Sequence, residues 1–140
     1  MGASRHQIFD YTSARTGLKG ILDFSARGGA SVIRRSTGSA AVVDADRLRS
    51  YLESSLDLEG VTVHEDGAWA AFLPGIPVAA EATSLDEAVA ELVAALREYA
   101  EDWTDHLSHA PNHRGHWGLV QLVELSTDDQ LAGWLTGDPH

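Results

Sequence analysis

The sequence predicts an α+β protein made of a small head and a larger acidic part, and three observations lead to this prediction. In residues 13–26, apolar side chains recur three and four positions apart, as on one face of a helix. Two β-branched segments follow at 31–33 and 41–43. Between residues 61 and 83, three strand-like segments lead into a long amphipathic helix that begins near Leu85.

The head is expected to begin with a short strand over residues 7–12 and to continue into one helix. Ser13 is placed to cap that helix, because its hydroxyl can accept a bond from a backbone N–H two or three residues on. Gly17 and Gly20 lie inside the helix and each costs on the order of 1 kcal/mol relative to alanine. Gly28 supplies the stop, since glycine tolerates the left-handed backbone that closes a helix.

The rest of the head is predicted to be a hairpin and a second helix. Residues 36–39 form the expected turn, and Asp44 is a second N-cap. The apolar face of the second helix consists of Leu48, Tyr51, Leu52 and Leu56. A unit of this size buries little apolar surface alone, so we predict that residues 1–56 form a dimer.

The second part begins with a predicted hairpin whose turn is Asp66-Gly67, followed by a third strand over 78–83. Ser84 and Glu87 have the spacing of a capping box, so a helix is expected to start there. The apolar positions of this helix alternate in spacing between four and three: Leu85, Val89, Leu92, Leu96, Tyr99 and Trp103.

The last thirty residues are less determined by pattern. Pro111 is expected to end the long helix, and residues 117–125 fit a strand or a helix equally well. A final short helix is predicted, capped by Ser126 or by Thr127. The two tryptophans of this region either pack back on the sheet or belong to a partner interface, where tryptophan is enriched.

Composition narrows the class of protein. The 140 residues include no cysteine, which excludes disulfides and thiolate metal sites. No apolar run approaches the roughly 20 residues of a membrane span, and no signal segment opens the chain, so we expect a cytoplasmic protein with no membrane partner. Residues 1–50 hold eight basic and four acidic residues, a net +4, whereas residues 51–140 hold two basic and seventeen acidic ones, a net −15. Such asymmetry suggests two partners of opposite charge.

About the first 55 residues contain an ordered set of short segments: Ser13-Ala14-Arg15, Leu18 and Leu22, Arg27-Gly28, Val32-Ile33-Arg34-Arg35, Ala41-Val42-Val43, and the helix from Asp44 through Leu52. In this order of segments the head resembles the Phd/YefM family of antitoxins, also called prevent-host-death proteins. The resemblance implies a β-α-β-β-α head that dimerises and binds DNA.

Two further segments stand out in residues 60–103: Trp69-Ala70-Ala71-Phe72-Leu73-Pro74-Gly75 and Thr83-Ser84-Leu85-Asp86-Glu87-Ala88. With these segments, residues 60–103 are similar to HicB-type antitoxin domains, whose partial ribonuclease-H-like fold runs β-β-β-α. The expected division is therefore a Phd/YefM-like dimerisation and DNA-binding domain over 1–56, a HicB-like domain over 57–108, and a C-terminal helical tail over 109–140 that contacts a toxin.

These resemblances imply an antitoxin of a type II toxin–antitoxin module. It would neutralise a basic toxin of the ribonuclease type by direct binding, and would repress its own operon by binding operator DNA as a homodimer or higher even oligomer. The candidate DNA-binding residues are Arg5, Arg15, Lys19, Arg27, Arg34 and Arg35. The candidate toxin-binding residues are Asp102, Trp103, Asp105, Trp117, Leu122 and Trp134. A stand-alone transcriptional regulator whose acidic part senses a small ligand is the alternative, and an interaction protein that binds no DNA is the third possibility.

No catalytic site is expected. The acidic pairs at residues 65–66 and 86–87 lie in a turn and at a helix start, with no sign that they converge, and no phosphate-binding glycine loop is present. One cluster could hold zinc: His106, His109, His113 and His116. Pro111 interrupts this cluster and no thiolate assists it, so a metal-free role without a cofactor is the expectation.

Overall fold

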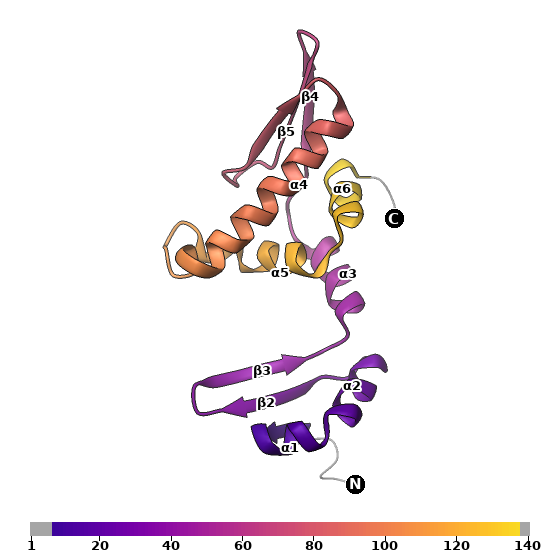
Figure 1. The fold of residues 1–140 in the computed structure, drawn as a ribbon, viewed down its shortest axis with the longest axis vertical. Helices are drawn as coiled ribbons and strands as arrows, with labels where there is room; N and C mark the ends of the chain where they lie inside the picture. The colour runs from indigo at the N-terminus through magenta and orange to yellow at the C-terminus, as the bar shows by residue number, and fades with distance from the viewer. Residues whose placement is uncertain (1–6, 138–140) are drawn as a thin grey trace. The chain divides into compact units, whose positions relative to one another are not determined.

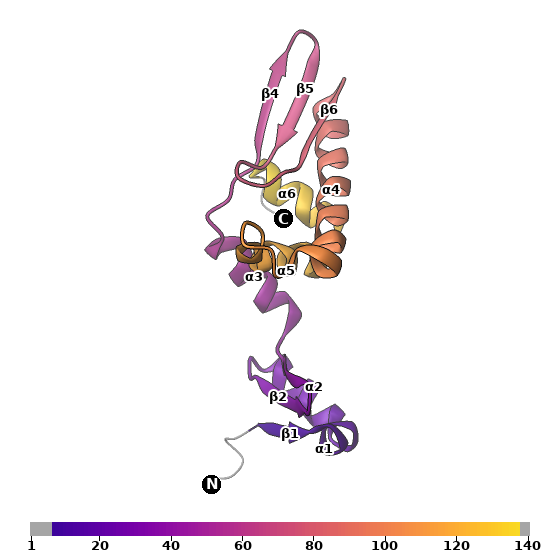
Figure 2. The ribbon, with the colours of Figure 1, turned by 90° about the vertical axis from the view of Figure 1, so that its left-hand side faces the viewer.

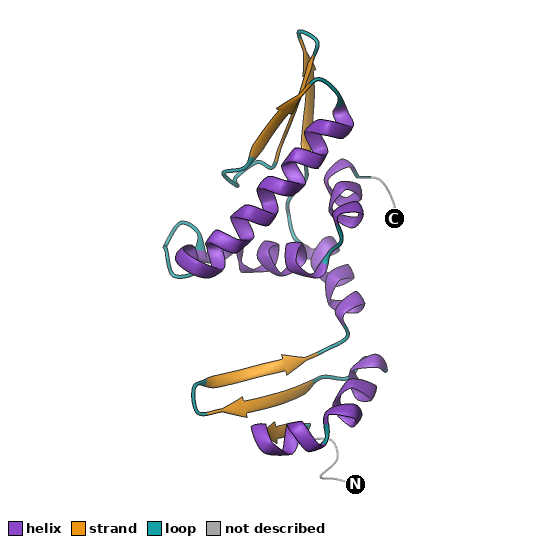
Figure 3. Ribbon diagram, in the orientation of Figure 1, coloured by secondary structure: helices purple, strands orange, loops and turns teal. Residues whose placement is uncertain are grey.

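The computed structural model describes residues 7–137 of the chain, which divides into two compact units, Met1–Ser50 and Tyr51–His140. Each contains a three-stranded sheet with helices, as the α+β prediction requires (Figure 3). The division lies within one helix, α3 (Ala45–Ser55). Asp44 is the N-cap of α3, as predicted, because its Oδ2 accepts a bond from the N–H of Arg47 at 3.0 Å.

Unit 1 is built on the sheet β1-β2-β3, formed by Ile8–Asp10, Ser31–Arg35 and Gly38–Val42 (Figure 1). β1 pairs with β2 in parallel, whereas β2 and β3 form an antiparallel hairpin. The hairpin is tighter than predicted, since β2 continues to Arg35 and β3 already begins at Gly38, inside the segment 36–39 that we expected to be the turn. Arg35 pairs with Gly38, whose positive φ of 151° suits glycine.

The single helix predicted over 13–26 is wrong, because the chain forms two helices, α1 (Tyr11–Thr16) and α2 (Leu18–Ala26). Gly17 separates them with φ −102° and ψ 16°, outside the helical region. The predicted cap is also wrong: Asp10 is the N-cap of α1, and its Oδ1 accepts the backbone N–H of Ser13 at 2.7 Å. The stop is confirmed, since α2 ends before Gly28, which has φ 95°.

Unit 2 contains the antiparallel sheet β4-β5-β6, formed by Val61–Glu65, Ala68–Phe72 and Ala79–Ala82. The predicted Asp-Gly turn is confirmed. Asp66 has φ 54° and Gly67 has φ 78°, so two consecutive residues have the positive φ that a two-residue hairpin turn of the primed type needs. His64 on β4 and Trp69 on β5 face each other in the register, and their rings stack at 4.4 Å.

The long helix is confirmed as α4 (Leu85–Asp102), which packs on β5 and β6 (Figures 1 and 2). Ser84 is its N-cap and accepts the N–H of Glu87 at 3.1 Å. Its inner face contributes more buried side chains to the core of unit 2 than any other element, including the predicted Val89, Leu92 and Leu96. The helix continues into a π-helical turn, η2 (Trp103–Leu107).

The last part of unit 2 is helical. A 3₁₀ turn, η3 (Arg114–His116), leads into α5 (Trp117–Leu125), and α6 (Asp128–Thr136) follows. Both α5 and α6 pack on α4. Of the two readings of 117–125, the helical one is therefore confirmed. Thr127, the second of the two predicted caps, begins α6 in a complete capping box with Gln130.

One side chain, Arg97 of α4, ties the ends of α5 and α6 to the long helix. Its guanidinium donates to the carbonyl oxygens of Val123 and Ser126 at 2.5 and 2.8 Å, and to Oδ1 of Asp128 at 2.8 and 3.1 Å. The two carbonyls lie at the C-terminal end of α5, where helices leave such groups without a partner. Within residues 7–137, no helix is long and apolar enough to span a membrane.

Candidate functional site

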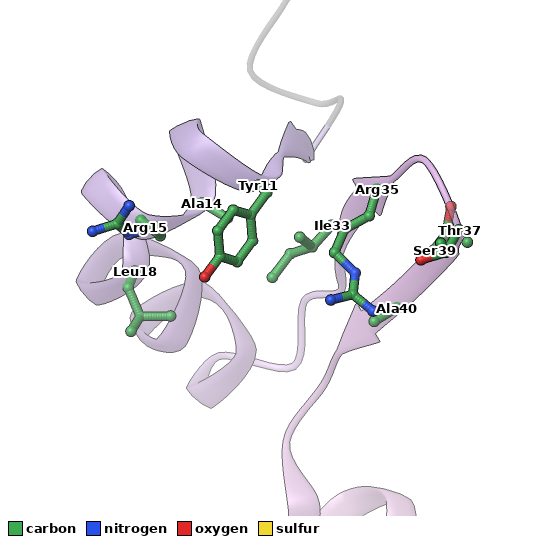
Figure 4. Close-up of a pocket in the computed structure, with 10 residues that line it drawn as sticks. Tyr11, Ala14, Arg15, Leu18, Ile33, Arg35, Thr37, Ser39 and Ala40 are labelled. Atoms are coloured by element: carbon green, nitrogen blue, oxygen red, sulfur yellow. The ribbon is translucent and has the colours of Figure 1, made fainter.

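Unit 1 contains an open hollow of about 490 Å³ between α1, the start of α2 and the β2–β3 hairpin (Figure 4). Tyr11 and Leu18 line its helical side and Ile33 lies opposite, on β2. Apolar atoms make up most of its lining, while two arginines, Arg15 and Arg35, stand at its margins. The hollow therefore combines apolar surface with positive charge.

The structure brings together only some of the predicted DNA-binding residues. Arg15 and Arg35 line the same hollow. Arg34 is exposed but points to the other face of the sheet, because successive side chains of a strand alternate between faces. Arg34 therefore does not line the hollow with Arg15 and Arg35.

The remaining predicted basic residues lie on the exposed surface of α2 or outside the described residues. Lys19 forms a 2.8 Å ion pair with Asp23, one turn further along α2, and its side chain is 91% exposed. Such a pair contributes little to stability. The guanidinium of Arg27 lies 5.6 Å from the centroid of the Phe24 ring. Arg5 lies outside the residues that the structure describes.

Unit 1 exposes large apolar side chains and buries few. Tyr11 is 56% exposed, Leu18 47% and Leu22 51%. Among its described residues, the buried apolar side chains are Ala14 and Ile21. The balance is unusual for an isolated domain, since contiguous exposed apolar surface commonly marks an interaction site.

The predicted toxin-binding residues separate into exposed and buried sets. Asp102, Asp105 and Trp117 are exposed, and Trp134 is half-buried. Trp103 and Leu122 are buried in the core of unit 2, and the indole N–H of Trp103 donates to the carbonyl of His113 at 2.8 Å. We therefore no longer place these two side chains among the contact residues, because they hold the helices of unit 2 together.

The histidine cluster is organised around a tyrosine that the sequence analysis assigned only to the apolar face. The hydroxyl of Tyr99 lies 2.9 Å from Nδ1 of His113 and 2.6 Å from Nδ1 of His116. A hydroxyl has one proton, so with both rings neutral it donates to one Nδ1 and accepts from the other. His106 and His109 are exposed. Among the described residues, no group of three metal-ligating side chains forms a site.

Burial alters the acid–base behaviour of this cluster. It lowers the pKa of His116 below the usual value, and repulsion from His113 lowers it further. Burial also raises the pKa of the Tyr99 hydroxyl. Both shifts favour the uncharged forms of His116 and Tyr99, and the hydrogen bonds of the Tyr99 hydroxyl link α4 to the segment that precedes α5.

Unit 2 also contains a groove that the sequence analysis missed. It has a volume of about 700 Å³ and lies between α4 and α6, with Gly60 and Thr62 of the adjoining strand region at one side. Three carboxylates line it: Asp86, Asp128 and Asp129. In the sequence these acids are visible only as the ordinary acidic first turns of two helices.

Comparisons with known proteins agree with this two-unit fold. A crystal structure from Syntrophomonas wolfei subsp. wolfei, described as an antitoxin part of a proposed toxin/antitoxin system, superposes with a TM-score of 0.70 and 22% sequence identity. The superposition covers 91% of this chain and 95% of the other. No curated protein matches the chain.

The family itself is identified by sequence. Residues 6–135 match the model of the PHD-like family, described as antitoxin of toxin-antitoxin, RelE / RelB, TA system. That match extends through both units and leaves only the two ends of the chain outside it. The chain therefore belongs to the PHD-like family of antitoxins, which are regulatory proteins and not enzymes.

Proposed function

We propose that this antitoxin uses its two units for two different partners. Unit 1 binds operator DNA as a dimer and represses the operon, and unit 2 neutralises a basic toxin of the ribonuclease type. Unit 1 corresponds to the Phd/YefM-like part of the sequence and unit 2 to the HicB-like part.

A single observation carries the proposal: the charge boundary coincides with the structural boundary. Residues 1–50 have a net charge of +4 and residues 51–140 a net charge of −15, and the division between the compact units falls between Ser50 and Tyr51. A charge of one sign confined to one unit attracts partners of the opposite sign to that unit. Nucleic acid suits the first unit and a basic protein the second.

The dimer is supported by the exposed apolar surface of unit 1. Tyr11, Leu18 and Ile33 border the hollow, and a unit with so few buried side chains gains stability when a second copy covers such a surface. The arginines at the margins of the hollow then lie at the rim of the interface, where charged groups remain solvated.

DNA binding is tested by gel shift with the DNA segment upstream of this chain's own gene. Replacement of both Arg34 and Arg35 by alanine is expected to abolish retardation, because phosphate contacts supply most of the affinity and both side chains are exposed. Arg34→Ala and Arg35→Ala separately then show which face of β2 meets the DNA. Arg114→Ala is the matched control, since Arg114 is an exposed arginine of unit 2.

A double variant that retards DNA as well as the wild type contradicts the DNA-binding assignment.

Toxin binding is tested in parallel by co-expression with any small basic protein that a gene beside this one encodes. A complex that survives purification at low salt and weakens as salt rises supports the charge argument. Absence of any complex contradicts the toxin half of the proposal.

A further inference from the structure

The groove between α4 and α6 has the form of a docking site for a helix. Its walls are two helices that lie side by side (Figures 1 and 2), and its volume is about 700 Å³. The 2.8 Å ion pair between Arg97 and Asp128 joins α4 to the start of α6 one helical turn beyond Val93, the last residue of α4 that lines the groove. This pair holds the two walls in place.

The groove has both polar and apolar lining, and several of its apolar residues are small. Val89 and Val93 of α4 are buried, whereas Ala90 is exposed, and α6 contributes Ala132 and Gly133. Small residues allow the backbone of another helix to approach closely. An incoming helix could therefore bury apolar surface here without any rearrangement of unit 2.

The negative charge of the groove favours a basic partner. None of the described residues that line it is basic, and one of its three carboxylates, Asp128, is already paired with Arg97. The other two, Asp86 and Asp129, are exposed in the first turns of α4 and α6. An acidic side chain in the first turn of a helix stabilises that helix, so helix stability by itself accounts for acidic residues at these two positions. In a unit with a net charge of −15 they also leave the groove with two acidic groups and no basic group among its described lining residues.

We propose that a basic amphipathic helix of the cognate toxin binds in this groove, with its apolar face on Ala90, Val93 and Ala132 and its cationic side chains on Asp86 and Asp129. The inference rests on the proposed function, because it names the surface by which unit 2 would hold a basic toxin. It also places the main contact on residues other than the six candidates from the sequence, although Asp129 and Ala132 lie in the predicted tail.

The first test fills the groove. Ala90→Trp places an indole inside it, and Ala94→Trp is the matched control, because Ala94 is an exposed alanine one turn further along α4 that does not line the groove. Affinity for the small basic protein encoded beside this chain is measured by titration calorimetry. Ala90→Trp is expected to weaken binding at least about tenfold and Ala94→Trp to leave it unchanged.

The second test reverses charge. Asp86→Lys combined with Asp129→Lys is compared with Glu87→Lys combined with Glu91→Lys, which changes the net charge equally at exposed positions outside the groove. The first pair is expected to weaken binding at least about tenfold at low salt, with a smaller loss at high salt. The second pair should have a clearly smaller effect. Circular dichroism of all variants checks that they remain folded.

The outcomes separate this inference from the proposed function. If the wild type binds the toxin and the groove variants bind equally well, the groove is not the site, although the toxin-binding function stands. If the wild type binds no small basic protein, both the proposed toxin-binding function and the inference about the groove are contradicted. If Ala90→Trp instead lowers the oligomeric state of the chain alone in sedimentation, a second copy occupies the groove and the inference is overturned.

Discussion

At the scale of single residues, two of the four histidines that suggested a metal site, His113 and His116, are hydrogen-bond partners of Tyr99. The short contacts from the Tyr99 hydroxyl to His113 and His116 occupy the Nδ1 atoms of both rings. The pair therefore serves to join α4 to the segment before α5.

The lowered pKa of His116 predicts acid sensitivity. In the unfolded chain this histidine titrates near its usual value of 6.5, whereas the folded protein keeps it neutral to lower pH. The unfolded state thus binds more protons in that window, so the stability contributed by neutral His116 is complete above pH 6.5 and is lost as pH falls through the folded pKa. Thermal melts of the wild type between pH 7 and pH 5 should show this fall.

The variant His116→Asn tests the assignment, because asparagine offers a polar atom near the position of Nδ1 but does not titrate. We expect its melting temperature to fall less steeply with pH than that of the wild type. His109→Asn is the control, since His109 is exposed and lies outside the hydrogen bonds that join Tyr99 to His113 and His116. Identical pH slopes for wild type and His116→Asn would show that the stability comes from elsewhere.

At the scale of elements, the hydrogen bonds of Arg97 attach the last two helices, α5 and α6, to α4. Its guanidinium donates to two carbonyl oxygens at the end of α5 and to the carboxylate of Asp128 at the start of α6. Arg97→Met keeps the apolar stem but removes these bonds. Hydrogen bonds from a charged group contribute about 1.5–3 kcal/mol each, so a loss of about 3 kcal/mol in the free energy of unfolding is expected.

The measurement for Arg97→Met is urea unfolding followed by tryptophan fluorescence, because all four tryptophans lie in residues 51–140. Arg114→Met provides the comparison: it removes the same group from an exposed position in η3 and should change stability by less than about 0.5 kcal/mol. A midpoint for Arg97→Met equal to that of the wild type would mean that α5 and α6 are held by apolar packing alone.

At the scale of the whole molecule, the fold assigns opposite charges to separate units and leaves the smaller unit short of buried surface. We expect the chain to be a dimer at micromolar concentration in analytical ultracentrifugation, through the exposed apolar surface of unit 1. Leu18→Glu combined with Leu22→Glu places charge on that surface and should raise the dimer dissociation constant at least about tenfold.

The control for the dimer is Val63→Glu, which introduces the same side chain at an apolar position of unit 2 that is 41% exposed. It should leave the dimer intact. A well-folded monomer of the wild-type chain at micromolar concentration would contradict the dimer and would remove the reason given for the exposed leucines of α2.

Local backbone features could be read from the sequence because they depend on neighbouring residues. The turn at Asp66-Gly67 needs positive φ at two successive positions, and Ser84 needs only the N–H of Glu87 three residues on. The predictions of the first helix and its cap that were wrong also depended on neighbouring residues. Asp10 competes with Ser13 for the cap, and Gly17 interrupts a helix whose apolar spacing is otherwise regular.

The sequence by itself determined the α+β class, the order of most strands and helices, and the charge boundary, since periodicity and charge are properties of the chain. Only the tertiary structure decided that Arg15 and Arg35 line one hollow, that Leu122 is core, and that Asp86 and Asp129 border one groove. The physical reason is that a surface is made by elements distant in sequence, and packing decides which of their faces remain open to a partner.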